Sequence, residues 1–197
     1  MKDSAMEPLR LISRAIDALN RRIGRFTVWF ILASVLISAG NASMRKAFGL
    51  ASNAWLEGQW YLFAAAFLLA SGYVLMVDEH VRVDALAQRF SPRLRAWIDV
   101  LALVLAVLPL CVLMVGLGAE YFWRAWTEGE RSFNSDGLVR WPVRLCIPLG
   151  FALLGLQSLS EIIKRIEFLQ GRRTRATTCE ADLPEFMGPA PVGSPRP

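Results

Sequence analysis

Four long apolar stretches without a charged side chain dominate the pattern of hydrophobic and polar positions along the chain. They cover residues 26–44, 58–77, 100–119 and 145–160. A run of about 18 or more apolar residues is long enough for a helix to cross the hydrocarbon core of a bilayer. Trp141, Pro142 and Val143 extend the shorter fourth stretch, and Arg144 is expected to reach toward the lipid headgroups. The pattern predicts an all-α membrane protein with four transmembrane helices, the last over about residues 143–160.

Residues 1–24 show a different periodicity, in which apolar residues recur every three or four positions with basic residues between them. The apolar positions are Leu9, Ile12, Ile16, Leu19 and Ile23. This spacing predicts an amphipathic helix. We expect it to lie on the cytoplasmic surface of the membrane, where apolar burial and anionic lipids both hold such a helix. A helix that binds a partner protein has the same pattern.

The segment between the second and third stretches predicts another interfacial helix over about residues 84–98. Asp84 can cap a short helix, and Ser91 followed by Pro92 is an N-cap followed by proline at the first helical position. An apolar stripe runs along both parts, formed by Leu86, Phe90, Leu94, Trp97 and Ile98. We expect an arm that lies against the membrane and continues into the third transmembrane helix.

The C-terminal part of the chain differs in composition from the rest. From about residue 169 it becomes polar, and it ends in the proline-rich sequence MGPAPVGSPRP. Such a composition cannot form an apolar core, so we expect a disordered tail. The predicted organisation is therefore an amphipathic helix over 1–24, a transmembrane domain over 25–168 and a cytoplasmic tail over 169–197.

Positive charge is distributed unevenly around the four stretches. Most of the 22 lysines and arginines precede the first stretch, follow the fourth, or lie between the second and the third. Basic residues collect on the cytoplasmic side of membrane proteins, so both termini and the segment between the second and third stretches are predicted to be cytoplasmic. For the same reason, the net charge of +5 indicates membrane topology and not a surface that binds nucleic acid.

The single histidine, His80, lies in the charged segment DEHVRVD at residues 78–84. With the neighbouring carboxylates it could form a metal site. However, adjacent residues cannot easily face one ion, and transition metals prefer more nitrogen or sulfur ligands. One alternative is a solvated turn in which Arg82 pairs with nearby carboxylates. Another is a turn that docks on a partner or orders the arm.

Ionisable side chains are absent from the interior of the four stretches, although proton relays and many ion paths require them there. The chain also lacks the HExxH, GxSxG and phosphate-loop motifs, and its three cysteines have no ligand or disulfide spacing. We therefore expect a chain that is not an enzyme, with no catalytic residue, metal or cofactor. A sodium site built from backbone carbonyls would leave no such trace.

Small residues recur within the stretches, often four positions apart. They are Ser34, Ser38, Ala42, Ala66, Ala70, Ala102, Ala106, Gly116, Gly118, Gly150 and Gly155. Small residues at such spacing let membrane helices approach closely, either within one chain or between two membrane proteins. Pro109 lies in the middle of the third stretch and predicts a kink or a loosened helix there.

Two segments of the chain, together with its layout, resemble the small membrane subunit of tripartite ATP-independent periplasmic (TRAP) transporters. One segment is GYVLMVDEHVRVDALAQRFSPRLRAWIDV, with its HVRVD turn and the SPR that follows. The other is AEYFWRAWTEGERSFNSDGLVRWPVRLCIPLGFALL, in which ERS and RWP precede IPLG. With the four-helix layout and the basic amphipathic start, the resemblance covers roughly residues 20–168.

The resemblance implies a non-catalytic scaffold subunit in the inner (cytoplasmic) membrane of a bacterium. Such a subunit would brace a large multi-span permease, which carries the substrate and sodium sites, while a periplasmic solute-binding protein delivers an organic acid. The resemblance also implies structural or docking roles for His80, Arg82, Asp84, Pro92, Arg131, Arg140, Trp141 and Pro142. The alternatives are a membrane anchor or assembly subunit of another complex, and a stand-alone four-helix transporter.

Overall fold

The computed structural model describes residues 7–49, 52–77, 91–134 and 137–171. His80, Arg82 and Asp84, the first part of the expected arm, and the tail from residue 172 lie outside these residues. The described helices are α1 (Glu7–Phe48), α2 (Asn53–Val77), α4 (Pro92–Ala102), the π-helical η1 (Leu103–Val107), α5 (Leu108–Thr127) and α6 (Trp141–Leu169). They form four membrane-length units, because α4, η1 and α5 are continuous. Each of the four apolar stretches lies within one unit, which confirms the predicted fold class.

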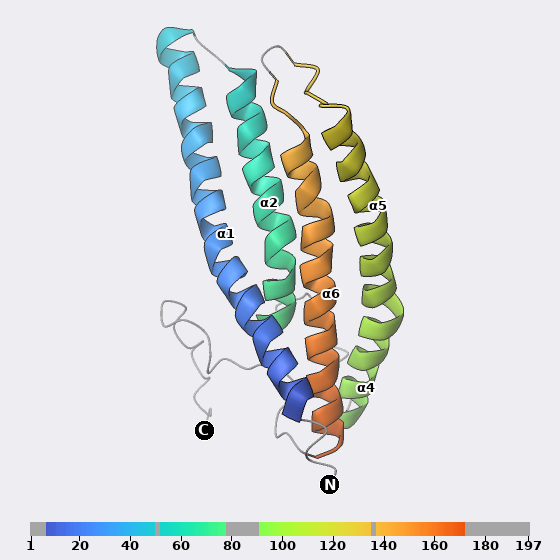
Figure 1. Ribbon diagram of the computed structural model, residues 1–197. Helices are drawn as coiled ribbons and strands as arrows, with labels where there is room; N and C mark the ends of the chain where they lie inside the picture. Colours follow the sequence, from blue (N-terminus) through green and yellow to red (C-terminus); the bar gives the residue numbers. More distant parts are fainter. Residues whose placement is uncertain (1–6, 50–51, 78–90, 135–136, 172–197) are drawn as a thin grey trace, which may run out of the picture.

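The four units lie side by side in a row. α1 packs on α2, α2 on α6, and α6 on α5, so the order across the row is α1, α2, α6, α5 (Figure 1). A row has no enclosed centre, and many large apolar side chains are therefore exposed. Phe67 and Val112, for example, are both 73% exposed. Lipid tails can cover such side chains, whereas in water they would form large adhesive patches.

Helix α1 is longer than one membrane crossing. Its 42 residues span about 60 Å, roughly twice the thickness of the hydrocarbon core. The predicted amphipathic segment is thus the first half of the same helix that contains the first apolar stretch. Near its start α1 crosses onto α6 (Figure 1).

The first half of α1 contacts the protein through its polar side. Ser13, Asn20 and Gly24 are buried there, while Ile12 and Leu19 of the apolar stripe are 52% and 44% exposed. Much of the apolar stripe is therefore not covered by the described part of this chain. That exposure is the one expected if lipid or a partner covers the stripe.

Pro109 disturbs the third unit, as its position in the sequence predicted. Proline has no backbone N–H, so the carbonyl of Leu105 loses its usual donor four residues later. The preceding segment Leu103–Val107 is π-helical, and the N–H of Leu108 donates to the carbonyl of Leu103 five residues before it. The helix is thus locally widened before Pro109.

Glycines allow close contacts between neighbouring helices. A methyl group on Gly150 of α6 would lie 2.6 Å from the carbonyl oxygen of Leu68 on α2. A methyl group on Gly118 of α5 would lie 3.1 Å from Pro148 of α6. Gly116, in contrast, faces open space. Several small residues found in the sequence therefore serve packing within the chain.

These contacts predict that one Gly→Ala substitution lowers the stability of the fold and that another does not. Gly150→Ala should lower the free energy of unfolding by about 1–3 kcal/mol, because α2 and α6 must move apart to accept the methyl group. Gly116→Ala is the matched control and should cause no loss, since nothing lies near the added carbon. Thermal unfolding in detergent measures both, and equal melting temperatures for the two variants would contradict the close α2–α6 contact.

Candidate functional site: polar clusters at both ends of the helix row

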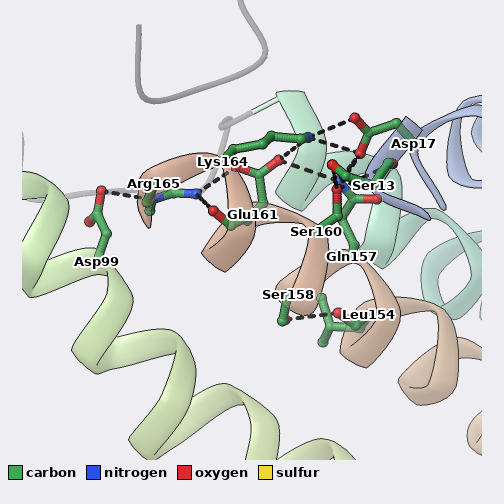
Figure 2. A network of polar contacts seen from close by, with 10 residues as sticks. All are labelled: Ser13, Asp17, Asp99, Leu154, Gln157, Ser158, Ser160, Glu161, Lys164 and Arg165. Carbon is green, nitrogen blue, oxygen red and sulfur yellow. Dashed lines mark hydrogen bonds and ion pairs between the residues drawn. The ribbon is translucent and has the colours of Figure 1, made fainter. Parts of the chain in front are cut away.

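The first cluster lies at the end of the row where α1 begins and α6 ends. At its centre Glu161 accepts from Lys164 Nζ at 2.7 Å and from Arg165 Nη1 at 2.5 Å (Figure 2). Lys164 also contacts Asp17 of α1 at 2.8 Å, and Arg165 Nε contacts Asp99 of α4 at 3.3 Å. These ion pairs connect α1, α6 and α4.

Uncharged side chains extend this cluster along the contact between α1 and α6. Asp17 accepts hydrogen bonds from Ser160 and from Gln157, both at 2.8 Å. Ser160 also shares a 2.7 Å hydrogen bond with Ser13, and Asn20 donates to Gln157 at 2.9 Å. The two helices therefore meet through polar groups that mostly satisfy one another, as buried polar groups usually do; among the described residues, Asn20 Oδ1 is an exception without a partner.

Burial makes the charges at this end interdependent. Glu161 is 1% exposed, Lys164 2% and Arg165 0%. An ionised side chain without a partner is very unfavourable in such surroundings, whereas a fully paired one is tolerated. Loss of one member therefore destabilises the structure mainly through the charge that is left behind.

The second cluster lies at the opposite end, where a short loop joins α5 to α6. Gly129 has a φ of +60° and ends α5, with hydrogen bonds from Gly129 N to Trp126 O and from Glu130 N to Ala125 O. This is a Schellman motif, which favours glycine at the left-handed position. Arg131 then pairs with Val139 in an isolated antiparallel bridge. The loop returns to α6 as a narrow hairpin.

Glu130 is the charged centre of this loop. It accepts two hydrogen bonds from Arg144 at 2.5 and 2.7 Å and one from Arg140 at 3.2 Å. The guanidinium of Arg144 also lies over the ring of Tyr121, 3.8 Å from its centroid. Arg144 is 7% exposed. Within this chain its partner is Glu130, and that it extends to the level of the lipid headgroups stays a prediction.

A further carboxylate, Glu57 of α2, holds the loop against the row. It accepts hydrogen bonds from the Ser132 hydroxyl, from Asn134 Nδ2 at 2.7 Å and from the backbone N–H of Leu138 at 2.8 Å. The loop thus joins α2 as well as α5 and α6. At its base, Trp141 packs edge-to-face on Trp126, with 4.8 Å between ring centroids.

The structure places five of the eight predicted docking residues. Pro92 is the first residue of α4, and the Ser91 hydroxyl accepts from the N–H of Leu94, as the capping pattern predicted. The other four are at the opposite end of the row: Arg131, Arg140, Trp141 and Pro142. Pro92 and this group of four are therefore not parts of one site. Whether any of them contacts a partner stays a prediction.

The two clusters have the chemistry of structural supports. Among the described residues, no group of three or more histidine, cysteine or acidic side chains is arranged to hold a metal ion. The carboxylates Glu161, Glu130 and Glu57 each accept two or more hydrogen bonds from this chain. The donors to Glu161 lie on its own helix, α6, whereas those to Glu57 come from the α5–α6 loop and those to Glu130 come from Arg140 and Arg144.

Sequence reasoning missed the residues that form both centres. Glu161, Lys164 and Arg165 follow the fourth apolar stretch, and their spacing of three and four residues indicates side chains on one helix face. That spacing was a usable signal. Glu57 gave no comparable signal, because the residues that donate to it lie on a loop far away in the sequence. Glu130 belongs to the ERS motif of the resemblance, but its spacing from Arg140 and Arg144 does not by itself indicate a pairing.

We expect Arg165→Met to destabilise the protein by about 3–5 kcal/mol, because it leaves Glu161 buried with one partner fewer. Arg124→Met is the matched control. Arg124 pairs with Glu120 on an exposed surface, so its loss should lower the free energy of unfolding by less than about 1 kcal/mol. Unfolding in detergent by a chemical denaturant measures both. Similar losses of unfolding free energy in the two variants would show that the buried ion pair stabilises the protein no more than the exposed one.

The loop should open when Glu130 is protonated. Hydrogen bonds from Arg144 hold the pKa of Glu130 below its ordinary value, so the pairing is complete above the ordinary value and is lost as pH falls through the lowered one. Arg144→Gln should move the Glu130 titration upward toward the ordinary pKa, while Arg124→Gln should leave it unchanged. Carboxyl ¹³C NMR of labelled glutamate measures the titration. An unchanged midpoint in Arg144→Gln would refute the assignment.

A comparison with protein families identifies the chain. Residues 34–168 match the family described as the DctQ component of tripartite ATP-independent periplasmic transporters. Comparisons with curated proteins and with solved structures gave no match. The matched region contains about the last third of α1, all of α2, α4, η1 and α5, the α5–α6 loop, and α6 except for its last residue. The chain therefore belongs to the DctQ family and is a multi-pass membrane component of a TRAP transporter.

Proposed function

We propose that this chain is the stationary scaffold subunit of its transporter. It braces a large permease subunit in the bilayer and carries no substrate itself. The observation that carries the proposal is the helix row with polar clusters at both ends. Ionisable side chains are absent from the middle of each apolar stretch, so this chain offers no charged path for an ion or a proton.

A row of helices suits a brace. It presents two broad apolar faces, one of which can contact a partner helix while the other contacts lipid. The apolar stripe of the first half of α1 enlarges this surface beyond the four crossings, with Ile12 and Leu19 exposed on it. A moving permease domain needs a wide fixed frame, and a wide frame resists tilting better than a compact bundle does.

The orientation follows from the charge distribution. Basic residues are concentrated in the first half of α1, around α4, and at and after the end of α6, which favours a cytoplasmic position for both termini. The α5–α6 loop then faces the periplasm. We place the subunit in the bacterial inner membrane, beside a permease that couples uptake of an organic acid to sodium and receives it from a periplasmic binding protein. The family assignment supports these partners.

The residues expected to dock on the permease are those of the resemblance. His80, Arg82 and Asp84, which precede α4 in the sequence, would act at the cytoplasmic end. Arg131, Arg140, Trp141 and Pro142 would act at the loop end, where Trp141 and Arg140 are already fixed by Trp126 and Glu130. Docking residues that are held in place lose less conformational entropy on binding.

Reconstitution tests the scaffold role. In liposomes with an inward sodium gradient, this chain alone should give no uptake of organic acid, and uptake should require the permease and the binding protein. A tagged form of the chain should also purify with the permease in mild detergent. Sodium-driven uptake by the chain alone would overturn the proposal in favour of a stand-alone transporter.

Docking is tested by substitution in the same complex. Arg82→Ala and Asp84→Ala should each reduce the amount of co-purified permease, whereas Arg124→Ala, whose side chain pairs with Glu120 on an exposed surface, should not. Metal analysis of the wild type and of His80→Ala distinguishes a docking turn from the alternative, a metal site at His80. A stoichiometric metal that is lost in His80→Ala would indicate a metal site in place of a docking turn.

A further inference from the structure

A cavity of about 640 Å³ opens between α2 and α6 beneath the α5–α6 loop. Its volume is within the range of small-molecule sites, which is roughly 300–1,000 Å³. Its lining along α2 extends from Asn53 to Leu68, which corresponds to about 22 Å of helix. The cavity therefore extends along α2 from the loop end toward the middle of the row.

The lining changes character along this length. At the loop end it is polar, with Glu57, Asn134 and Arg140. Deeper along α2 and α6 it is apolar, with Leu68 and Ile147. An occupant must therefore have a polar end and an apolar end.

Aromatic side chains mark the depth of this change. Trp60, Tyr61 and Tyr121 line the cavity between its polar and apolar parts. Tryptophan and tyrosine collect at the boundary between lipid headgroups and hydrocarbon. The polar part thus lies at the level of the headgroups, and the apolar part lies at the level of the acyl chains.

The polar part contains N–H and O–H groups that make no hydrogen bond within the described part of this chain. Arg140 donates one hydrogen bond to Glu130 among the described residues, although a guanidinium has five N–H groups and suits phosphate. The phenol of Tyr61 likewise has no hydrogen-bond partner in the described part of the chain. These groups can bind a phosphate and an ester oxygen.

We propose that this cavity binds one phospholipid of the adjacent leaflet, with its phosphate at Arg140 and one acyl chain along α2 toward Leu68. A water-soluble anion would leave the apolar part without an occupant. A partner helix with a wholly apolar surface would leave the polar part without an occupant, whereas a phospholipid matches both parts of the lining. The lipid joins α2 to α6 at the level where their side chains leave a gap.

Filling the cavity tests the proposal. Ala64 lines it, and Ala64→Phe should remove a phospholipid that otherwise stays bound, one per chain, when the complex with the permease is purified in mild detergent. Ala102→Phe adds the same side chain at an exposed position of α4 and should retain the lipid. Native mass spectrometry counts bound lipid and permease in the same sample. Equal lipid in both variants, or none in the wild type, overturns the proposal, whatever the permease content.

The position of the lipid is tested in the wild-type complex, where no variant has to fold. A phospholipid with a photoreactive group at the end of one acyl chain should cross-link mainly to Leu68 and Ile147. Cross-links spread evenly over exposed residues such as Phe67 and Val112 would indicate ordinary boundary lipid and refute the site. Cross-links of the lipid to the permease in place of Leu68 and Ile147 would refute it as well.

The phosphate contact has its own control. Arg140→Gln should reduce lipid retention several-fold, while Arg124→Gln, outside the cavity, should not. Excess inorganic phosphate should leave the retained lipid unchanged, because phosphate alone does not fill the apolar part. Displacement of the lipid by inorganic phosphate would show that the site recognises an anion and would overturn the proposal.

Discussion

Glu161 is shared between Lys164 and Arg165 where water is nearly excluded, and the arrangement of the helices depends on this pairing. Charges in such surroundings interact strongly and cannot separate without a large penalty. Lys164 extends the pairing to α1 through Asp17, and Arg165 extends it to α4 through Asp99. Helices that are far apart in the sequence are thereby fixed at one end.

The row architecture makes these end contacts important. In a closed bundle each helix packs on neighbours around a common core, but here α1 and α5 are at the margins and pack mainly on one side. Apolar packing between membrane helices is also a weak guide to position, since lipid tails solvate apolar side chains equally well. Polar contacts at both ends, supported by close glycine contacts such as Gly150 on Leu68, supply the missing specificity.

The two ends also suit a membrane component that stays in place while its partner moves. Charged groups are concentrated near the interfaces, where they are tolerated, and the middle of the row is apolar. At the loop end, Glu130 and Glu57 tie the hairpin to α6 and α2. A component built this way can keep its shape while a partner domain slides past one face, which agrees with a scaffold role in a transporter of the DctQ family.

Hydrophobic patterning alone determined that this chain forms four membrane-length helices, because a membrane admits few other structures for apolar stretches of this length. The cap at Ser91 and the disturbance before Pro109 were equally predictable, since both depend on neighbouring residues. The order of helices across the row and the partner of Arg144 were decided by the tertiary structure. The sequence pattern gives each helix an apolar surface without saying which neighbour it meets, and Glu130 reaches Arg144 because the loop folds back on α6.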